Sequence, residues 1–412
     1  MNDVSMFSPE ALAASGFFTD PYPLYAMLRG AGPVVPVGPG RWAIGGHAAA
    51  SAALRDRRFG VKRHAEPLAR LRDTSPFLQL EGAMMLHHDP PDHTRLRALI
   101  SRSFTPQLIA ALQPGVERLI EELLAQALAA GEIDLIADFA YPLPVLVIAE
   151  ILGVPAVERE LLRGWSRQLT EAVQHTRLLA AGEGVNTAAL ARADEVAVAF
   201  GDYLWTRIEA RRRAPGDDLL SALIAAEAAG DRLSRQELIS TCALLLLAGH
   251  ETTMNLIGNG MLALLRHPEQ RALLADPSLW GGAVEELLRF DSPVQLTVRE
   301  LLEPVELAGR SLARGDEALI LLGAANRDPA RYERPDELDL LRGGVQPISF
   351  GAGIHYCIGA PLARLEGRLA LGALCTRVEV ALTGDPEGRD LAWNPNPSLR
   401  GLAAMPVRVT RA

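Results

Sequence analysis

Apolar residues recur at three- and four-residue spacing over much of the chain, which is the pattern of amphipathic α-helices. The clearest such segments are Leu108 to Ala129, Val157 to Thr170, Ala188 to Arg213 and Asp217 to Ala228. Strand signals are short. In the best of them, Val34, Val35 and Val37 face Trp42 and Ile44 across a Gly-Pro-Gly turn, which predicts a hairpin. No linker or repeat divides the chain, so the pattern favours a single, mostly α domain with small β pieces over residues 1–412.

The longest predicted helix covers residues 235–266 and would be about 48 Å long at a rise of about 1.5 Å per residue. Ser234 and Glu237 fit a capping box at its start. In its middle, Gly249 and two threonines are poor helix formers that follow a run of leucines. This stretch is either a locally weak part of a buried helix or a kink that holds polar groups against a ligand.

Composition narrows the class of protein. Hydrophobic residues make up 49% of the chain, enough for a large buried core. The net charge of -9 argues against a nucleic-acid binder, for which a basic domain would be expected. The three cysteines do not form a secreted disulfide framework. The N-terminus has no signal-peptide pattern and no segment is long and apolar enough to span a membrane, so we expect a cytoplasmic protein without an anchor.

One cysteine lies in an unusual setting. Cys357 follows Gly351 and Gly353, which permit positive φ angles, and precedes a helix that begins near Pro361. A helix N-terminus favours the thiolate form of cysteine, which is a nucleophile or a metal ligand. His355 is close in sequence and could act as a base, but we expect an extended segment here, in which the two side chains point to opposite sides. No second cysteine stands at zinc-ligand spacing, so a single thiolate ligand implies a cofactor that brings its other ligands, as haem does.

With these residues in view, the sequence resembles the cytochrome P-450 family of haem-thiolate monooxygenases over nearly its whole length. The haem-binding signature of that family is matched by Phe350, Gly353, His355, Cys357 and Gly359. The resemblance implies a mainly α fold with small β-sheets, in which one large helical domain surrounds a buried haem b and a long helix crosses the centre. It also implies that Cys357 is the iron ligand.

The weak stretch of the long helix, "AGHETT", matches a second motif of the family. By resemblance, the hydroxyl of Thr252 holds the hydrogen-bond network that delivers protons to dioxygen, and Glu251 relays protons from solvent. A hydroxyl can orient water and a carboxylate can exchange protons, so the residue types suit this role. His250 fills a variable position of the motif and receives no role.

A third motif is Glu286-x-x-Arg289, which by resemblance forms a buried ionic triad with Arg342 that supports the cysteine loop. The spacing alone is a weak signal, because Glu160 with Arg163, and Glu209 with Arg212, repeat it. We expect those two copies to be solvated pairs on helix surfaces. Position in the chain, between the threonine motif and the cysteine, identifies the copy that matters.

The resemblance also assigns partners for the two haem propionates, which need cations or hydrogen-bond donors. These partners are His93, Arg97, Arg299 and His355. A metal site in the neighbouring "HHDPPDH" segment is a weaker interpretation, because its proline pair breaks any regular ligand face.

The implied activity is insertion of one oxygen atom from dioxygen into an apolar small molecule, by hydroxylation or epoxidation. Terpenes, macrolides, steroids and fatty acids all suit such a site. The expected substrate contacts are Met84, Met85, Leu245, Ala248, Val294, Gln295, Leu296 and Leu399, with Gln295 as the polar residue that orients the substrate.

No reductase-like extension follows the cysteine, so we expect electrons to come from a separate ferredoxin and ferredoxin reductase. We also expect a monomer. Arg102, Arg364 and Arg368 are candidates for the docking face, and solvated arginines are an equal alternative. Two rival functions remain open. One is a peroxide-driven oxygenase, which usually lacks the acid and alcohol pair found here at Glu251 and Thr252. The other is a haem-binding sensor or carrier without turnover.

Overall fold

The computed structural model describes residues 16–61, 71–180, 187–216, 218–228 and 230–411. The chain divides into two compact units: residues 1–60, 120–141 and 252–412 form the first, and residues 61–119 and 142–251 form the second. Two long helices, α7 (Pro106–Ala130) and α12 (Arg235–Arg266), contribute residues to both units. The expectation that residues 1–412 form a single domain stays a prediction.

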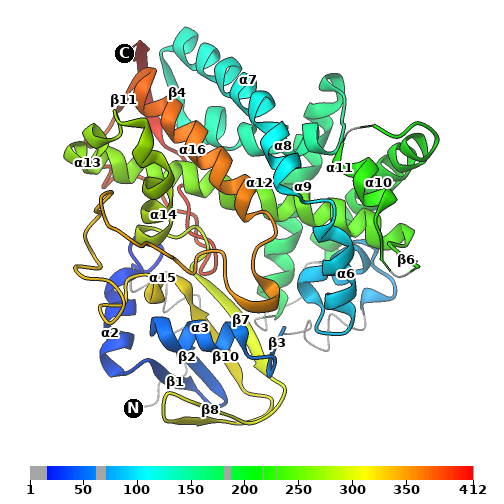
Figure 1. Ribbon diagram of the computed structural model, residues 1–412, viewed down its shortest axis with the longest axis horizontal. Helices are drawn as coiled ribbons and strands as arrows, with labels where there is room; N and C mark the ends of the chain where they lie inside the picture. The colour runs from blue at the N-terminus through cyan, green and yellow to red at the C-terminus, as the bar shows by residue number, and fades with distance from the viewer. Residues whose placement is uncertain (1–15, 62–70, 181–186, 217, 229, 412) are drawn as a thin grey trace. The chain divides into compact units, whose positions relative to one another are not determined.

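The first unit contains a five-stranded sheet in the order β1-β2-β10-β7-β3. Its strands are Val34–Gly38, Arg41–Ile44, Glu317–Leu321, Leu296–Leu301 and Phe59–Gly60. Only the β10 and β2 pair is parallel among these strands. The β1–β2 hairpin confirms the predicted one, with Val34 opposite Ile44. Figure 1 shows the blue N-terminal strands beside the yellow strands β10 and β7, although they are far apart in sequence.

Side chains alternate between the two faces of this sheet, as the period of a β-strand requires. Ile44 and Ile320 pack with α3 (His47–Arg55), while Ala43 and Leu319 pack with α2 (Tyr22–Ala31). The sheet therefore carries a helix on each face, and α3 lies beside the turn η5 (Gly353–His355) that leads to the cysteine.

The rest of the first unit is largely helical. Its helices and turns are η2 (Ile136–Ala140), α13 (Pro268–Leu273), η4 (Pro277–Leu279), α14 (Trp280–Phe290), α15 (Leu322–Ala325) and α16 (Ala360–Thr376). A three-stranded sheet is formed by β11 (Val378–Leu382), β12 (Pro406–Arg411) and β4 (Glu132–Asp134), and a hairpin by β8 (Val305–Leu307) and β9 (Arg310–Leu312).

The second unit is a helical cluster around α10 (Thr187–Arg213), which buries Phe200, Leu204 and Ile208 against its neighbours. Its helices and turns are α5 (Pro76–Gly82), η1 (Met85–His87), α6 (Asp92–Ser101), α8 (Pro142–Ile151), η3 (Ala156–Glu158), α9 (Arg159–Ala180) and α11 (Leu219–Ala225). The predicted helices at 108–129, 157–170 and 188–213 are thus confirmed, with α9 longer than expected.

The helix predicted from Asp217 to Ala228 is wrong at its end. Asp217 lies outside the described residues, and α11 stops at Ala225. The chain then forms a small hairpin of β5 (Glu227–Ala228) and β6 (Asp231–Arg232). Gly230 takes a φ of +80° in the turn between them, a conformation that no helix can continue through.

The predicted long helix is confirmed at both ends as α12. At its start, the Ser234 N–H donates to the carboxylate of Glu237 at 2.8 Å, and the Glu237 N–H donates to the Ser234 hydroxyl at 3.3 Å. These two bonds form the predicted capping box. The helix continues without a break through Gly249 and the threonines. In the described part of the chain, no helix has the length and hydrophobicity that crossing a membrane requires.

Candidate active site

Cys357 lies in the short loop between η5 and α16, as predicted. Its backbone N–H donates to the carbonyl of Phe350 at 2.9 Å, which closes the loop. Gly351 and Gly353 both have positive φ, +70° and +69°. At Gly353 packing adds a second constraint, because a Cβ there would lie 2.2 Å from the carbonyl oxygen of Leu54 in α3. The loop can therefore approach α3 only with glycine at this position.

Gly359, the N-cap of α16, lies next to the Cys357 thiol. Its φ is -81°, so the backbone does not require glycine there. A Cβ on Gly359 would lie 3.9 Å from the Cys357 sulfur, at ordinary van der Waals distance. The half-buried thiol therefore lies at the N-terminal, positive end of α16.

The reasoning that separated His355 from Cys357 is wrong in its geometry. It assumed an extended segment, but His355 closes the 3-10 turn η5, and in an extended segment residues two apart would share a face. The relative direction of the His355 and Cys357 side chains therefore depends on the conformation of η5 and cannot be taken from strand periodicity.

The residues present fit a cofactor that brings its own ligands. Among the residues that the structure describes, no group of three or more His, Cys, Asp or Glu side chains is placed to hold a metal ion. A metal bound at Cys357 would thus take a single protein ligand from this loop. Haem iron has that requirement, since four of its ligands are porphyrin nitrogens.

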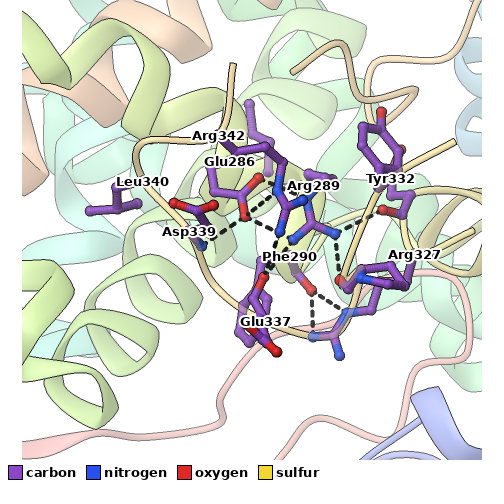
Figure 2. A network of polar contacts seen from close by, with 12 residues as sticks. Glu286, Arg289, Phe290, Arg327, Tyr332, Glu337, Asp339, Leu340 and Arg342 are labelled. Atoms are coloured by element: carbon purple, nitrogen blue, oxygen red, sulfur yellow. Dashed lines mark hydrogen bonds and ion pairs between the residues drawn. The ribbon is translucent and has the colours of Figure 1, made fainter. Parts of the chain in front are cut away.

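The structure brings Glu286, Arg289 and Arg342 together (Figure 2). One carboxylate oxygen of Glu286 accepts from Arg289 Nε at 2.7 Å. The other accepts from Arg289 Nη2 at 2.8 Å and Arg342 Nε at 3.2 Å. The Asp339 N–H donates to the same oxygen at 3.0 Å. Glu286 and Arg289 are completely buried. The buried carboxylate is thus satisfied by two cations and one amide, as a charge in an apolar interior requires.

The two arginines also bind the segment that precedes the cysteine loop. Arg289 donates to the carbonyls of Asn326, Pro335 and Glu337 at 3.1, 2.6 and 2.9 Å. Arg342 donates to the carbonyls of Glu333, Arg334 and Glu337. Because this segment has no regular secondary structure, its carbonyl groups need such donors when they are buried. The ionic triad therefore fixes the path of residues 326–342 relative to α14.

A second polar cluster in this region was missed by the sequence analysis. The Asn326 side chain donates to the hydroxyls of Ser292 and Ser349, each at 2.8 Å, and accepts from the N–H of Ile348 at 2.8 Å. Ser349 in turn donates to the carbonyl of Leu288 at 2.8 Å. Asn326 and Ser292 are fully buried and Ser349 nearly so. This cluster joins the end of α14 directly to the segment that leads to Phe350. Short polar residues in loops are too common for their pattern to reveal it.

Arg327 is another missed residue. It donates to the carbonyl of Phe290 at 2.9 and 2.6 Å and stacks over the ring of Tyr22, 3.4 Å from its centroid. Figure 2 shows it beside the triad, capping the end of α14 at Phe290. A basic side chain at a helix C-terminus satisfies the last carbonyls and suits the helix dipole.

Thr252 lies one turn before the part of α12 that packs against α16, at residues 256 and 260. A Cβ on Gly367 would meet Leu256 at 2.8 Å, and one on Gly260 would meet Leu371 at 3.0 Å. From the first pair to the second, the residue number increases by four in both helices, so the two helices run in the same direction through this contact. The turn of α12 that contains Thr252 and the first turn of α16, which follows Cys357, therefore lie at the same end of this helix–helix contact. Glu251 precedes Thr252 and belongs to the second unit.

The residues expected to bind the propionates divide between the units. Arg299, in β7, is buried and donates to the Thr297 hydroxyl at 2.8 Å and to the Val298 carbonyl at 2.9 Å. His355 also belongs to the first unit. His93 and Arg97 lie one turn apart on α6 in the second unit, so they share a helix face. Burial lowers the pKa of His93, and the charge of Arg97 lowers it further.

The expected substrate contacts occupy varied positions. Leu245, Leu296, Met84 and Met85 are buried, whereas Ala248 is exposed although it lies in the middle of α12. Val294 pairs with Leu399 in an isolated bridge.

Gln295 is 1% exposed and its amide nitrogen donates to the carbonyl of Ser292 at 2.7 Å. Its carboxamide lies directly against Gly323, where a Cβ would be 2.2 Å from the Gln295 oxygen. The structure thus shows a role for Gln295 in shaping the backbone, and substrate orientation stays a prediction.

Of the arginines expected at a docking face, Arg364 is engaged within the chain. It pairs with Glu285 at 2.5 Å, bonds to the Tyr356 hydroxyl at 3.1 Å and stacks on Phe350 at 4.5 Å. Burial lowers the pKa of Arg364, but the hydrogen bonds to Glu285 and Tyr356 outweigh it and raise the pKa overall. Arg364 thus also orders the cysteine loop. Arg102 is exposed and Arg368 is half-buried.

Comparison with known proteins adds independent information. A model of the family described as "Cytochrome P450" matches residues 44–275 and 279–393. The chain is 42% identical over 408 residues to the cytochrome P450 monooxygenase PikC of Streptomyces venezuelae, covering 96% of this chain and 92% of that protein. It is also 42% identical over 408 residues to the vitamin D(3) 25-hydroxylase of Pseudonocardia autotrophica, covering 96% and 95%. Among solved structures, P450BioI in complex with acyl carrier protein carrying hexadec-9Z-enoic acid gives a TM-score of 0.86 at 36% identity, covering 96% and 99%.

Proposed function

The chain belongs to the cytochrome P450 family, and we propose that this monooxygenase hydroxylates a bulky apolar natural product using electrons from a separate ferredoxin and its reductase. The family implies a haem-thiolate cofactor, for which we propose haem b with Cys357 as the iron ligand. The observation that carries the substrate class is the likeness to proteins named for vitamin D3 and for a long-chain fatty acid on its carrier. Both molecules are largely hydrocarbon.

Within this proposal the haem supplies the chemistry and the chain prepares the site in two ways. When bound, the haem supplies the redox centre at which dioxygen is reduced and one of its atoms is transferred to a C–H bond. The N-terminus of α16 stabilises the thiolate of Cys357. The ionic triad and the Asn326 cluster keep the cysteine loop rigid, because their members are buried and hydrogen-bonded.

The proposed proton pathway uses Thr252 and Glu251. The Thr252 hydroxyl orients a water molecule toward the oxygen-binding side, and the half-buried carboxylate of Glu251 exchanges protons with solvent. His93, Arg97, Arg299 and His355 would hold the two propionates. Their chemistry suits this role, because arginine binds carboxylates in a bidentate manner and histidine can donate one hydrogen bond.

We propose that Arg102, which is exposed, and Arg368, which is half-buried, are the main candidates for the electron-donor contact, with Arg364 as a support of the cysteine loop. The net charge of -9 makes a local cationic patch the natural contact for an acidic ferredoxin, since the rest of the surface repels it. We also propose that the protein is a cytoplasmic monomer, which a small diffusing electron donor could reach.

The experiment that tests this function is a screen of sterols, macrolide lactones, terpenes and long-chain fatty acids. A substrate should displace the axial water and change the haem spin state. Turnover with ferredoxin, reductase and dioxygen should then yield a product that is one oxygen atom heavier. Product formation from hydrogen peroxide alone, at the same rate in Thr252→Ala as in the wild type, would favour the peroxide-driven alternative. Binding of apolar compounds without any consumption of reductant would favour a sensor or carrier.

A further inference from the structure

His250 is buried in the middle of α12, at the motif position to which the family resemblance gives no role. Its Nδ1 lies 2.6 Å from the carbonyl oxygen of Leu246, one turn earlier on the same helix. A carbonyl oxygen only accepts, so Nδ1 carries a proton. Burial lowers the pKa of His250 although the Leu246 carbonyl raises it, so the ring is neutral. Its Nε2 is then an acceptor.

Two hydroxyl groups of α9 lie against this ring. The Ser166 oxygen is 3.2 Å from Nδ1 and 3.5 Å from Nε2, and the Thr170 oxygen is 3.4 Å from Nε2. Ser166 is completely buried. The Thr170 hydroxyl has a single proton and lies within reach of two acceptors, Nε2 of His250 and the Ser166 carbonyl at 2.9 Å, so this proton is shared between them. The two residues are one helical turn apart, so they present their oxygens on the same face of α9. The imidazole therefore bridges α12 and α9.

The same turn of α12 is packed closely against α8. A Cβ on Gly249 would lie 3.0 Å from Cδ1 of Ile148. Helix α12 is thus held by a close apolar contact at Gly249 and by a polar contact at His250. Successive side chains on a helix are about 100° apart, so fixing residue 250 also fixes the directions of residues 251 and 252.

We propose that His250 is a positioning residue for proton delivery. Its imidazole, held between the Leu246 carbonyl and the hydroxyls of Ser166 and Thr170, sets the rotation of the α12 turn that presents Glu251 and Thr252. The inference rests on the proposed role of those two residues. The contacts to α9 are long for hydrogen bonds, so each contributes little free energy and its loss should have a modest effect.

Three substitutions separate the bond from Nδ1 to the Leu246 carbonyl from the contact of Nε2 with the α9 hydroxyls. Gln at 250 places an oxygen near the position of Nε2 and can accept from the α9 hydroxyls. Asn at 250 places a donor near the position of Nδ1 but is too short to reach α9. Leu at 250 provides neither contact. We expect His250→Asn and His250→Leu to release roughly threefold more peroxide per reductant consumed, and His250→Gln to stay within about twofold of wild type, as loss of one weak hydrogen bond predicts.

Two further readouts distinguish positioning from damage to the fold. The red-shifted band of the ferrous carbon monoxide complex and the affinity for substrate should stay unchanged in all three variants. Amide hydrogen exchange at residues 247–253 should become faster in the Asn and Leu variants only, since the turn is less firmly held. Equal exchange and equal peroxide release in wild type and His250→Leu would overturn the proposal.

The contribution of α9 is tested from its own side. Thr170→Val keeps the shape of the side chain and removes the hydroxyl, and it should cause the same uncoupling as His250→Asn. The double variant should be no worse than either single one, because both remove one contact. Strictly additive effects would overturn the proposal. If Glu251→Gln and Thr252→Ala also leave coupling unchanged, the proton pathway itself fails. If those two uncouple turnover and the His250 and Thr170 variants do not, only the positioning role fails.

Discussion

Two Glu-x-x-Arg pairs in different regions of the molecule have the same spacing and similar geometry. Glu286 and Arg289 in α14 lie 2.7 Å apart, and Glu160 and Arg163 in α9 lie 2.9 Å apart. Their side chains are 1% and 0% exposed in α14, but 75% and 30% exposed in α9. In α14 the carboxylate also accepts from Arg342 and the Asp339 N–H. The distance within an ion pair is thus a poor guide to its contribution to the free energy of unfolding. Burial and the remaining hydrogen bonds decide it.

The largest effect is expected for Glu286→Gln. The substitution leaves Arg289 as a buried cation without a counter-charge, which should cost about 3–5 kcal/mol of unfolding free energy. We also expect most of the purified protein to lack haem, because the segment before the cysteine loop loses its anchor. Urea unfolding and the haem-to-protein ratio measure both effects. Stability within about 1 kcal/mol of wild type would contradict the contrast between the two regions.

A second variant tests the effect of burying a carboxyl group that, unlike Glu286, is held by no arginine in the described part of the chain. Glu366, in α16, is 1% exposed and, among the described residues, its Oε2 has no hydrogen-bond partner. Burial raises the pKa of this carboxyl from 4.5 to about 8. The folded state therefore keeps a proton that the unfolded chain releases, so this group makes stability fall as pH rises from the unfolded pKa toward the folded one.

Between pH 5 and pH 7, Glu366 should thus remove about 2–3 kcal/mol of stability. Glu366→Gln, a neutral isostere, should lack this slope and be more stable than wild type at pH 7. Thermal midpoints at the two pH values test this, with Glu160→Gln as the exposed control. Parallel pH profiles for wild type and Glu366→Gln would show that the carboxyl is ionised in the folded protein.

A smaller effect is expected for Arg342→Met. The Arg342 side chain is 10% exposed, and Glu286 keeps its bonds from Arg289 when Arg342 is lost. Of the hydrogen bonds that Arg342 makes, the three to carbonyls are exposed to solvent, and only the one to Glu286 is partly buried and charge-assisted. We therefore expect a loss of about 1.5 kcal/mol, typical of one hydrogen bond to a charged group. Urea unfolding beside Glu286→Gln measures the ratio of the two effects. A loss as large as that of Glu286→Gln would mean that the triad acts as one indivisible unit.

The smallest effect belongs to the exposed pair. Glu160→Gln should change stability by less than about 0.5 kcal/mol, and the change should vanish at high salt because solvent and ions screen the pair. Glu209→Gln in α10 is a second exposed example with an ion-pair distance of 2.8 Å. A salt-independent loss above about 1 kcal/mol at either position would contradict the contrast.

Local signals in the sequence predicted the fold well where the local chain determines it. The capping box at Ser234 and the proline after His267 define α12 to the residue, since both act within one helical turn. The prediction was wrong at Ala225, where a turn with Gly230 at positive φ ends α11 earlier than its apolar pattern suggests. Helical periodicity cannot reveal where a hairpin begins if the apolar residues continue into it.

The candidate site was predictable to the extent that motifs name residues. Cys357, Glu286 and Arg289 stand out because rare residue types occur at fixed spacing. Asn326 and His250 do not, since their importance comes from contacts to residues 22 to 84 positions away. Such contacts depend on tertiary packing, which a single sequence does not display. Gly353 is an intermediate case, because its glycine was noticed but the close approach of Leu54 was not predictable.

The central claim is that Cys357 binds haem iron as a thiolate. The absorption spectrum of the ferrous carbon monoxide complex tests it most directly, because the thiolate ligand shifts the main band strongly to the red. The account predicts this band in the wild type and its loss in Cys357→Ser. A wild-type complex without the shifted band, or a Cys357→Ser complex that retains it, would contradict the account.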